Sequence, residues 1–328
     1  ASVEVFPEFE IKDYSKIEIS LEINQTEDSE MERVIEFYRS RMAKITPITG
    51  RPAQNQDVVT IDFKGSIDGK SFEGSEVENK VLLVGGNMFL GDFEKQLLGM
   101  EIGESKKMDV KVPDSYPKMD IAGKTVQFNV VLKSIQKRDL PELDDAFAKS
   151  ADPEKNFKSL EDMKLKIRDE LALENRRNAR KEAKQSLARK MTEQNPIDVP
   201  EILVKNQIRH MVRQEKQQAG KTVESETELK PTTPEEDEIH RETAVKLIQE
   251  ELIILKLAED LGIQIGEEEV EREVASFIQL LGEKNPGKMR KDWERNGTLD
   301  RIRSRMIKDK TLERLLDQVR LKEEIVDS

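Results

Sequence analysis

The chain has 328 residues, of which 55 are basic and 67 acidic, so its formal net charge is -12. A chain of this length predicts two or three domains, each large enough to bury a core. The excess of acidic side chains, with no basic block, makes nucleic-acid binding an unexpected function, because contacts with phosphates need clustered Lys and Arg.

Residues 1–45 predict a lead-in strand followed by a linker helix. Apolar and polar residues alternate over 17–23, which is the pattern of a strand with one buried face. The range 26–43 then carries apolar residues at helical spacing. We expect this strand and linker helix to pack toward a helical domain further along the chain.

Residues 46–137 predict a compact antiparallel α+β domain. Gly-bearing turns such as Asp68-Gly69 separate its strands. A single short helix fits, over 93–98, with Gly99 closing it. The expected strands are 58–63, 81–84, 106–112 and 126–135.

The period of the apolar residues changes from two to 3.6 after residue 138, so residues 138–328 predict an elongated all-α domain with projecting helical arms. Its first helix begins near Ser159 and stops before Pro196. Residues 245–261 are apolar on most sides and predict a buried central helix. The predicted fold class is therefore an α+β multidomain protein.

Few polar side chains are arranged for catalysis. His210 and His240 are the only histidines, and both lie in charged helical stretches, where a solvated position is expected. Gly86 and Gly91 have the spacing of a phosphate loop, but Asp92-Phe93 follows where Lys and Ser or Thr should stand. Acidic runs at likely helix starts are explained by the helix dipole. We expect no nucleotide, metal ion or other cofactor.

The chain contains no cysteine, which excludes disulfides, thiolate nucleophiles and Cys-based zinc sites. No apolar run approaches the roughly 18 residues that a membrane span requires, and no signal segment opens the chain. We therefore expect a cytoplasmic protein without a membrane partner.

Aromatic side chains gather in residues 46–137, although the whole chain is only 5% aromatic. Five stretches there, read in order, resemble the FKBP-type prolyl isomerase family. The order and spacing of these stretches make the resemblance fairly specific. They are Val59-Thr-Ile-Asp-Phe63-Lys-Gly65, Asp68-Gly69-Lys-Ser-Phe72-Glu73, Phe89-Leu90-Gly-Asp-Phe93-Glu, Leu98-Gly-Met-Glu-Ile-Gly103-Glu and Val126-Gln-Phe128-Asn-Val.

This resemblance implies an FKBP-like antiparallel sheet that carries a proline-binding pocket. Phe93 would form the floor of the pocket, and Phe89 and Leu90 would precede it as the family's two apolar residues. Glu73 would accept a hydrogen bond from the substrate backbone. The remaining pocket residues would be Phe63, Phe72, Tyr116 and Phe128.

The chain departs from the family pattern at three places. Lys80 stands where the family often has another pocket aromatic, and Asp92 replaces a frequent Gly before the floor aromatic. The loop between Tyr116 and Val126 is short. These departures predict weaker affinity for proline, or a pocket with one wall more open.

The resemblance extends beyond this domain, to the bacterial trigger factor family across nearly the whole chain. It rests on the lead-in Val5-Phe-Pro-Glu-Phe-Glu-Ile11, the exit Asp139-Leu-Pro-Glu-Leu-Asp144 and the helical tail that follows. That family also has an N-terminal ribosome-binding domain with a basic Gly-Phe-Arg-Lys type loop, a motif that this sequence lacks. The resemblance implies a lead-in over 1–45, an isomerase domain over 46–137 and a helical chaperone domain over 138–328, with ribosome contact only through a domain missing from this sequence.

The function implied is that of an ATP-independent chaperone that binds unfolded or nascent polypeptides and isomerises their proline-containing segments. The alternative is an FKBP-like scaffold that binds peptides without catalysis, which Lys80 and Asp92 make conceivable. Apolar helix residues that would contact clients fit a packed core as well. The candidates are Ile208, Met211, Val212, Phe277 and Ile278.

Overall fold

The computed structural model describes residues 9–327, apart from residues 73, 87–88, 117, 119–120, 219–232 and 283–284. Its contacts divide the chain into two units. The sheet unit is Thr26–Leu171, and the helical unit joins Ala172–Ser328 to the described part of Ala1–Gln25. The contact units have their boundaries at 25/26 and 171/172. The division expected from the sequence, at 45/46 and 137/138, stays a prediction.

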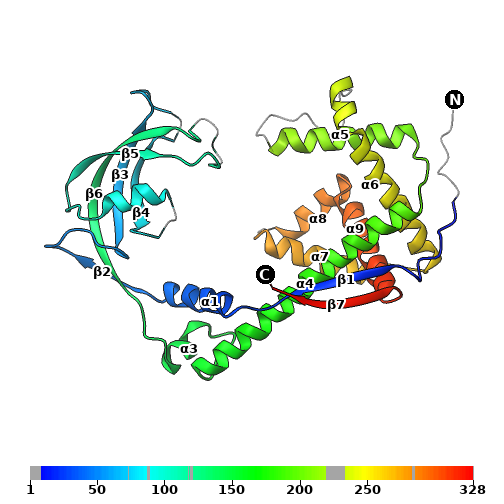
Figure 1. Ribbon diagram of the computed structural model, residues 1–328, viewed down its shortest axis with the longest axis horizontal. Helices are drawn as coiled ribbons and strands as arrows, with labels where there is room; N and C mark the ends of the chain where they lie inside the picture. Colours follow the sequence, from blue (N-terminus) through cyan, green and yellow to red (C-terminus); the bar gives the residue numbers. More distant parts are fainter. Residues whose placement is uncertain are drawn as a thin grey trace. The chain divides into compact units, whose positions relative to one another are not determined.

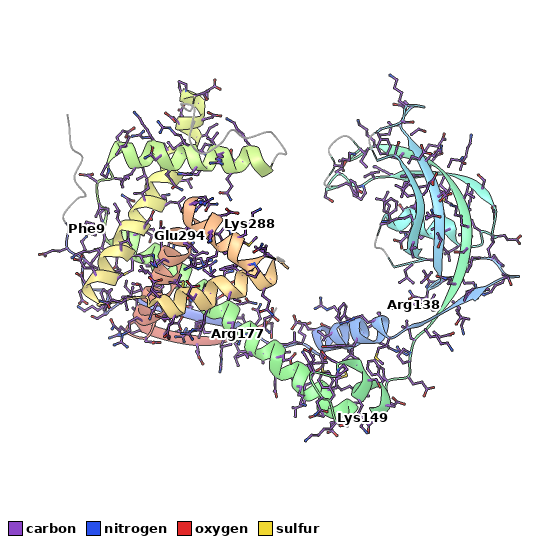
Figure 2. All side chains as sticks on the ribbon, turned by 180° about the vertical axis from the view of Figure 1, so that it is seen from behind. Phe9, Arg138, Lys149, Arg177, Lys288 and Glu294 are labelled. Atoms are coloured by element: carbon purple, nitrogen blue, oxygen red, sulfur yellow. The ribbon has the colours of Figure 1, made fainter. Side chains whose placement is uncertain are left out.

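The sheet unit is built on a five-stranded antiparallel sheet with the order β2-β6-β3-β4, to which β5 is added through β6. The long strand β6 pairs with β2 near Arg138, which is labelled in Figure 2, and with β5 at its other end. The strands are β2 (Lys44–Ile48), β3 (Val58–Ser66), β4 (Glu76–Leu83), β5 (Ser105–Lys111) and β6 (Thr125–Asp139).

The sheet encloses its core because inward residues alternate with outward ones along each central strand. In β3, Val59, Ile61 and Phe63 are buried. Register shifts at Thr60/Ile61 and Ile61/Phe63 bend β3 beside the last of these residues. Figure 1 shows the strands curving around the short helix α2 (Gly91–Leu97, cyan). The strands and helix predicted for this region are confirmed.

A bidentate ion pair fixes the chain where it enters β3. The Arg51 guanidinium donates to Asp57 with Nη1–Oδ2 and Nη2–Oδ1 distances of 2.6 and 2.9 Å. The backbone N–H of Gln54 donates to the same carboxylate at 2.8 Å. The hydrogen bonds from Arg51, opposed by desolvation, hold the pKa of the buried Asp57 below its usual value.

We expect Asp57→Asn to lower the unfolding free energy of the sheet unit by about 1–2 kcal/mol at pH 7, because the charge-assisted bonds are lost. The stabilisation is present above the ordinary Asp pKa and disappears as the pH falls through the lowered folded-state pKa. Urea unfolding of both proteins between pH 7 and 2 should therefore show the difference shrinking toward zero. A difference independent of pH would contradict the role of the Asp57 charge, and Asp92→Asn, on an exposed side chain, is the control.

Three helical segments complete the sheet unit. The linker helix α1 (Asp28–Arg41), the helix α3 (Asp145–Ala151) and the first turns of α4 (Leu160–Gln194) share one small core. Its buried members include Ile35, Phe147 and Ile167. The predicted linker helix is confirmed, and so is the end of α4 before Pro196.

The helical unit packs its helices around three clusters, of which two join α6 to its neighbours and the third joins α7, α8 and α9. The middle of α6 is buried, as predicted for 245–261, and contributes to the first two. Phe9, labelled in Figure 2, also packs against these two clusters. The helices are the remainder of α4, α5 (Glu201–Gln218), α6 (Pro234–Asp260), α7 (Glu267–Leu280), α8 (Pro286–Arg295) and α9 (Thr298–Leu316).

The α+β multidomain fold class is confirmed, with one addition to the helical part. Strand β1 (Glu18–Asn24) pairs in parallel with β7 (Arg320–Val326), so this unit contains a two-stranded sheet. The expectation that His240 is solvated is wrong: it is buried between α5 and α6, with its Nε2 3.4 Å from the Glu215 carboxylate. His210 is exposed as expected.

Candidate functional site

Four phenylalanine rings meet inside the sheet unit. Phe63 comes from β3, Phe128 from β6, Phe93 from α2 and Phe89 from the segment before α2. Each ring contacts the other three, with centroid distances from 5.1 to 6.5 Å and mostly edge-to-face geometry. We call this group the phenylalanine cluster; it brings together residues that the sequence spreads over more than 60 positions.

The phenylalanine cluster has a buried interior and an accessible edge. Phe93 is 0% exposed and Phe128 3%, so both lie in the interior. Phe89 is only partly buried, and Phe72 and Tyr116 are partly buried against the same core. These three rings therefore keep accessible surface around the core, whereas Leu90 is buried in it.

Gly65 in β3 allows the rings of Phe72 and Phe128 to approach the backbone. A Cβ atom on Gly65 would lie 3.1 Å from Phe128 Cε1 and 3.2 Å from Phe72 Cζ. Contacts this short are tighter than most Cβ contacts in proteins, so a side chain at this position would push the two rings away by a few tenths of an ångström. The Lys118 ammonium lies 6.0 Å from the centroid of the Phe72 ring, and its charge favours that ring's face.

A buried carboxylate holds the backbone of the segment before α2. Glu94 is fully buried, and its Oε1 accepts the backbone N–H of Phe89 at 2.9 Å. The Leu90 carbonyl accepts the N–H groups of Phe93 and Glu94 and so starts α2. Sequence reasoning did not select Glu94; its only signal was an acidic residue directly after the predicted floor aromatic.

We expect Glu94→Ala to raise the hydrogen-exchange rate of the Phe89 amide at least about tenfold, because the amide loses its acceptor. Glu94→Gln keeps an acceptor oxygen and should retain most of the protection. The measurement is residue-resolved hydrogen exchange by NMR. Equal protection in the wild type and in Glu94→Ala would show that this carboxylate does not hold the segment.

Two of the departures from the family pattern lie on the surface. Lys80 is exposed on β4, and Asp92 is exposed on α2, where its carboxylate pairs with Lys95 at 3.1 Å. Neither side chain belongs to the core around the phenylalanine cluster. Glu73, expected to accept a hydrogen bond from the substrate, lies outside the described residues.

The client-contact candidates of the helical unit are mostly core residues. Ile208 and Val212 are buried in the cluster between α5 and α6, and Ile278 is buried in the cluster of α7 to α9. Met211 and Phe277 are partly buried against the same clusters, and the Arg305 guanidinium lies 4.6 Å from the Phe277 ring centroid. The buried three offer no surface to a partner in this conformation.

Other apolar side chains of the helical unit are exposed. The most exposed pair is Leu280 and Leu281, at the end of α7, which are 83% and 62% exposed. The period of 3.6 marks such residues as part of a helix face but not which face is covered, so sequence reasoning missed them. The others are Leu173, Ile202, Ile239, Leu247, Leu255, Leu321 and Ile325.

The described residues contain no group of three His, Asp or Glu side chains placed to hold a metal ion. Among the described residues, the polar contact at the phenylalanine cluster is the hydrogen bond from the Phe89 N–H to Glu94, beside an apolar aromatic surface. Across the same part of the chain, no helix combines the length and apolar character that crossing a bilayer requires.

Two family models match the chain. Residues 49–133 match the model of the FKBP-type peptidyl-prolyl cis-trans isomerases, and residues 159–317 match the model of the bacterial trigger factor C-terminus. The first match covers β3 to β5 and the first part of β6, with all four rings of the phenylalanine cluster, but not β2. The second covers α4 to α9 completely.

Relatives match over most of the chain. The trigger factor of Caldicellulosiruptor bescii is 35% identical over 284 residues, which are 85% of this chain and 64% of the relative. That of Clostridium kluyveri is 28% identical over 325 residues, 98% of this chain and 75% of the relative. A solved trigger factor chaperone structure shares the fold, with a TM-score of 0.56 and 24% identity over 94% of this chain and 72% of its own. The chain thus spans 64% of the length of the first of these relatives.

Proposed function

Because the chain belongs to the trigger factor family, we propose that it is an ATP-independent chaperone whose sheet unit isomerises X-Pro bonds. The observation that supports the isomerase half is the phenylalanine cluster. Phe72, Phe89 and Tyr116, which keep accessible surface around the same core, would form its accessible edge. The chaperone half rests on the exposed apolar side chains of the helical unit. Its partners are unfolded or nascent polypeptides.

An aromatic surface is enough to catalyse this reaction. Rotation of an X-Pro amide meets a barrier of about 18–20 kcal/mol because it destroys the amide resonance, and no covalent bond breaks. The twisted amide has less charge separation than the planar one, so a dry aromatic surface binds the twisted form better. Proline would bind at the edge formed by Phe72, Phe89 and Tyr116.

The role of Phe93 as the floor requires a movement of its neighbours. Its ring is completely buried, and the Phe89 centroid lies 5.3 Å away. A proline ring reaches Phe93 once the Phe89 side chain turns aside. The bond from the Phe89 N–H to Glu94 belongs to the backbone and can persist during that side-chain rotation.

The rival function, a peptide-binding scaffold without catalysis, gains no support from the two departures in the sheet. Lys80 and Asp92 point to solvent and leave the aromatic rings unchanged. We therefore retain catalysis as the function of this unit. If the activity assay shows no catalysis, the function of this unit is that of a peptide-binding scaffold.

The helical unit would bind clients through apolar side chains that lie among charged ones. Leu280 and Leu281 stand at the end of a helix whose other turns carry ion pairs, such as Arg305 with Glu273. Exposed apolar groups of this kind favour contact with unfolded chains, while the surrounding charge keeps the surface solvated. Binding and release of this kind need no nucleotide.

A single refolding experiment tests both halves. A denatured protein whose slow refolding phase is limited by prolyl isomerisation is diluted into buffer without nucleotide. Catalytic amounts of the chain should accelerate the slow phase, and stoichiometric amounts should reduce light scattering. A dependence on ATP would contradict the chaperone half, and an unchanged slow phase would leave the scaffold.

A further inference from the structure

The two-stranded sheet of the helical unit has one covered edge and one open edge. Strand β1 lies between β7 and α4 (Figure 1). The outer carbonyls of β1 are bonded to side chains of α4: Lys190 Nζ donates to the Glu18 carbonyl at 2.7 Å, and Asn175 Nδ2 to the Asn24 carbonyl at 3.1 Å. The outer edge of β7 therefore forms the margin of this sheet.

The backbone groups on that margin are unpaired within the described residues. The Arg320 N–H donates to Ile17, and the Val326 carbonyl accepts from Gln25, so even-numbered residues of β7 direct their backbone toward β1. Since successive residues alternate, Leu321, Glu323 and Ile325 direct their N–H and C=O groups outward. Within the described residues, no backbone hydrogen bond reaches these groups. An open edge of this kind is a template for another extended strand.

The same three residues carry an apolar face beyond the core. Leu321 is in register with Ile19, and Ile325 with Ile23, so their side chains continue the face with which β1 covers the core. Ile19 is fully buried, whereas Leu321 is 36% exposed and Ile325 77%. A further strand on β7 would cover both side chains.

An acidic residue separates these two apolar side chains. Glu323 is exposed on the same face, and the described structure gives it no ion-pair partner. On the opposite face, Lys322 pairs with Glu324. A strand added to β7 would cover Glu323. The cost is lowest if the added strand carries a Lys or Arg next to Glu323, because opposite charges on neighbouring strands attract.

We propose that β7 binds an extended segment of a non-native polypeptide as a third strand, selecting a basic residue between two apolar ones at alternate positions. This inference rests on the proposed chaperone function, which supplies unfolded chains as partners. The unpaired backbone groups of β7 can pair only with an extended segment. Leu321, Glu323 and Ile325 determine which side chains that segment should carry. The surface is separate from the end of α7.

A second copy of the chain fits this edge less well than a client does. Two β7 strands paired antiparallel about Glu323 would place the two Glu323 carboxylates directly opposite each other. Like charges in opposing positions destabilise a sheet. The charge pattern thus argues for a basic client segment over self-association.

The test uses short fluorescent peptides and the whole chain. One peptide alternates threonine with valine, arginine and valine in the order Thr-Val-Thr-Arg-Thr-Val-Thr; a second has glutamate in place of arginine; a third is the arginine peptide with N-methylated alternate amides. Fluorescence anisotropy should show the arginine peptide binding about three- to tenfold more tightly than the glutamate peptide. Methylation should abolish binding, because it removes the donors that pair with the open edge.

Glu323→Lys should reverse the preference between the two charged peptides. Glu22→Lys makes the same charge change on the opposite face of β1 and should leave the preference unchanged. No binding by the wild type, or a preference that Glu323→Lys does not reverse, overturns the inference. If sedimentation shows that the wild type is a dimer and that Glu323→Lys is a monomer, β7 binds a second copy of the chain and not a client segment. Suppression of aggregation is measured in parallel, so a failure at β7 is distinguished from a failure of the chaperone function itself.

Discussion

Phe93→Ala is expected to reduce the acceleration of X-Pro isomerisation by about 100-fold or more and to destabilise the sheet unit by about 3–5 kcal/mol. Phe93 is completely buried and touches three other rings at 5.1, 5.3 and 5.9 Å. Removing its ring opens a cavity under Phe89 and Phe128 and removes the floor of the site. The activity is measured by cis-to-trans relaxation of a Phe-Pro peptide.

Loss of activity through simple unfolding is separated by a second variant. Phe93→Leu refills part of the cavity, so the sheet unit should stay folded, while the acceleration should still fall about tenfold because the ring is gone. Phe37→Ala is the matched control, since this ring of α1 is 59% exposed and lies outside the phenylalanine cluster. Full activity in a folded Phe93→Leu would remove Phe93 from the site.

Replacing Leu280 and Leu281 together by Ser is expected to raise about tenfold the concentration of chain needed to halve the aggregation of a refolding client. Each side chain is more than half exposed in the free chain. Covering one leucine fully is worth about 1.5–3 kcal/mol, and partial cover of two supports a tenfold effect. The measurement is light scattering during refolding without nucleotide.

The thermal stability of this double variant should remain within a few degrees of the wild type, because exposed side chains contribute little to folding. Gln279→Ser is the control, since it changes the neighbouring exposed position without removing an apolar group. Unchanged suppression by the double variant would exclude the end of α7 as a client surface. Prolyl isomerisation should be unaffected by either substitution.

The sheet domain could be predicted from sequence because its patterns are local. Period-two alternation in β3 and β6 marks the buried face directly, and Gly99 closes α2 with a φ of 83° that favours glycine. The strand β2 was missed because Pro47 and largely exposed neighbours give it no alternation. Its pairing with the end of β6, far along the chain, decides its conformation.

The helical unit was predictable in class but less so in detail. Strand β7 carries charged residues at four of the five positions before Ile325, and only pairing with β1, about 300 residues away, makes it a strand. The short helix α8 has no buried residue, and Pro286-Gly287 at its start give a turn signal in the sequence. Tertiary contacts decide both elements.

The candidate site was predictable where ring positions carry the family pattern. Phe63, Phe89, Phe93 and Phe128 do meet, although the sequence could not show that Phe93 would be fully covered. The helical candidates Ile208 and Ile278 were apolar residues at helical spacing, a pattern that packed and exposed faces share. Only the arrangement of neighbouring helices distinguishes them from Leu280.

The central claim is that proline rings bind against the aromatic edge of the sheet unit. Its most direct test is transferred-NOE spectroscopy of a Phe-Pro peptide with a chain whose phenylalanines and tyrosines are isotopically labelled. We predict contacts from the proline ring protons to Phe72, Phe89 and Tyr116, together with faster cis-trans exchange of the same peptide. Proline contacts confined to the helical unit, with unchanged exchange, would contradict the account.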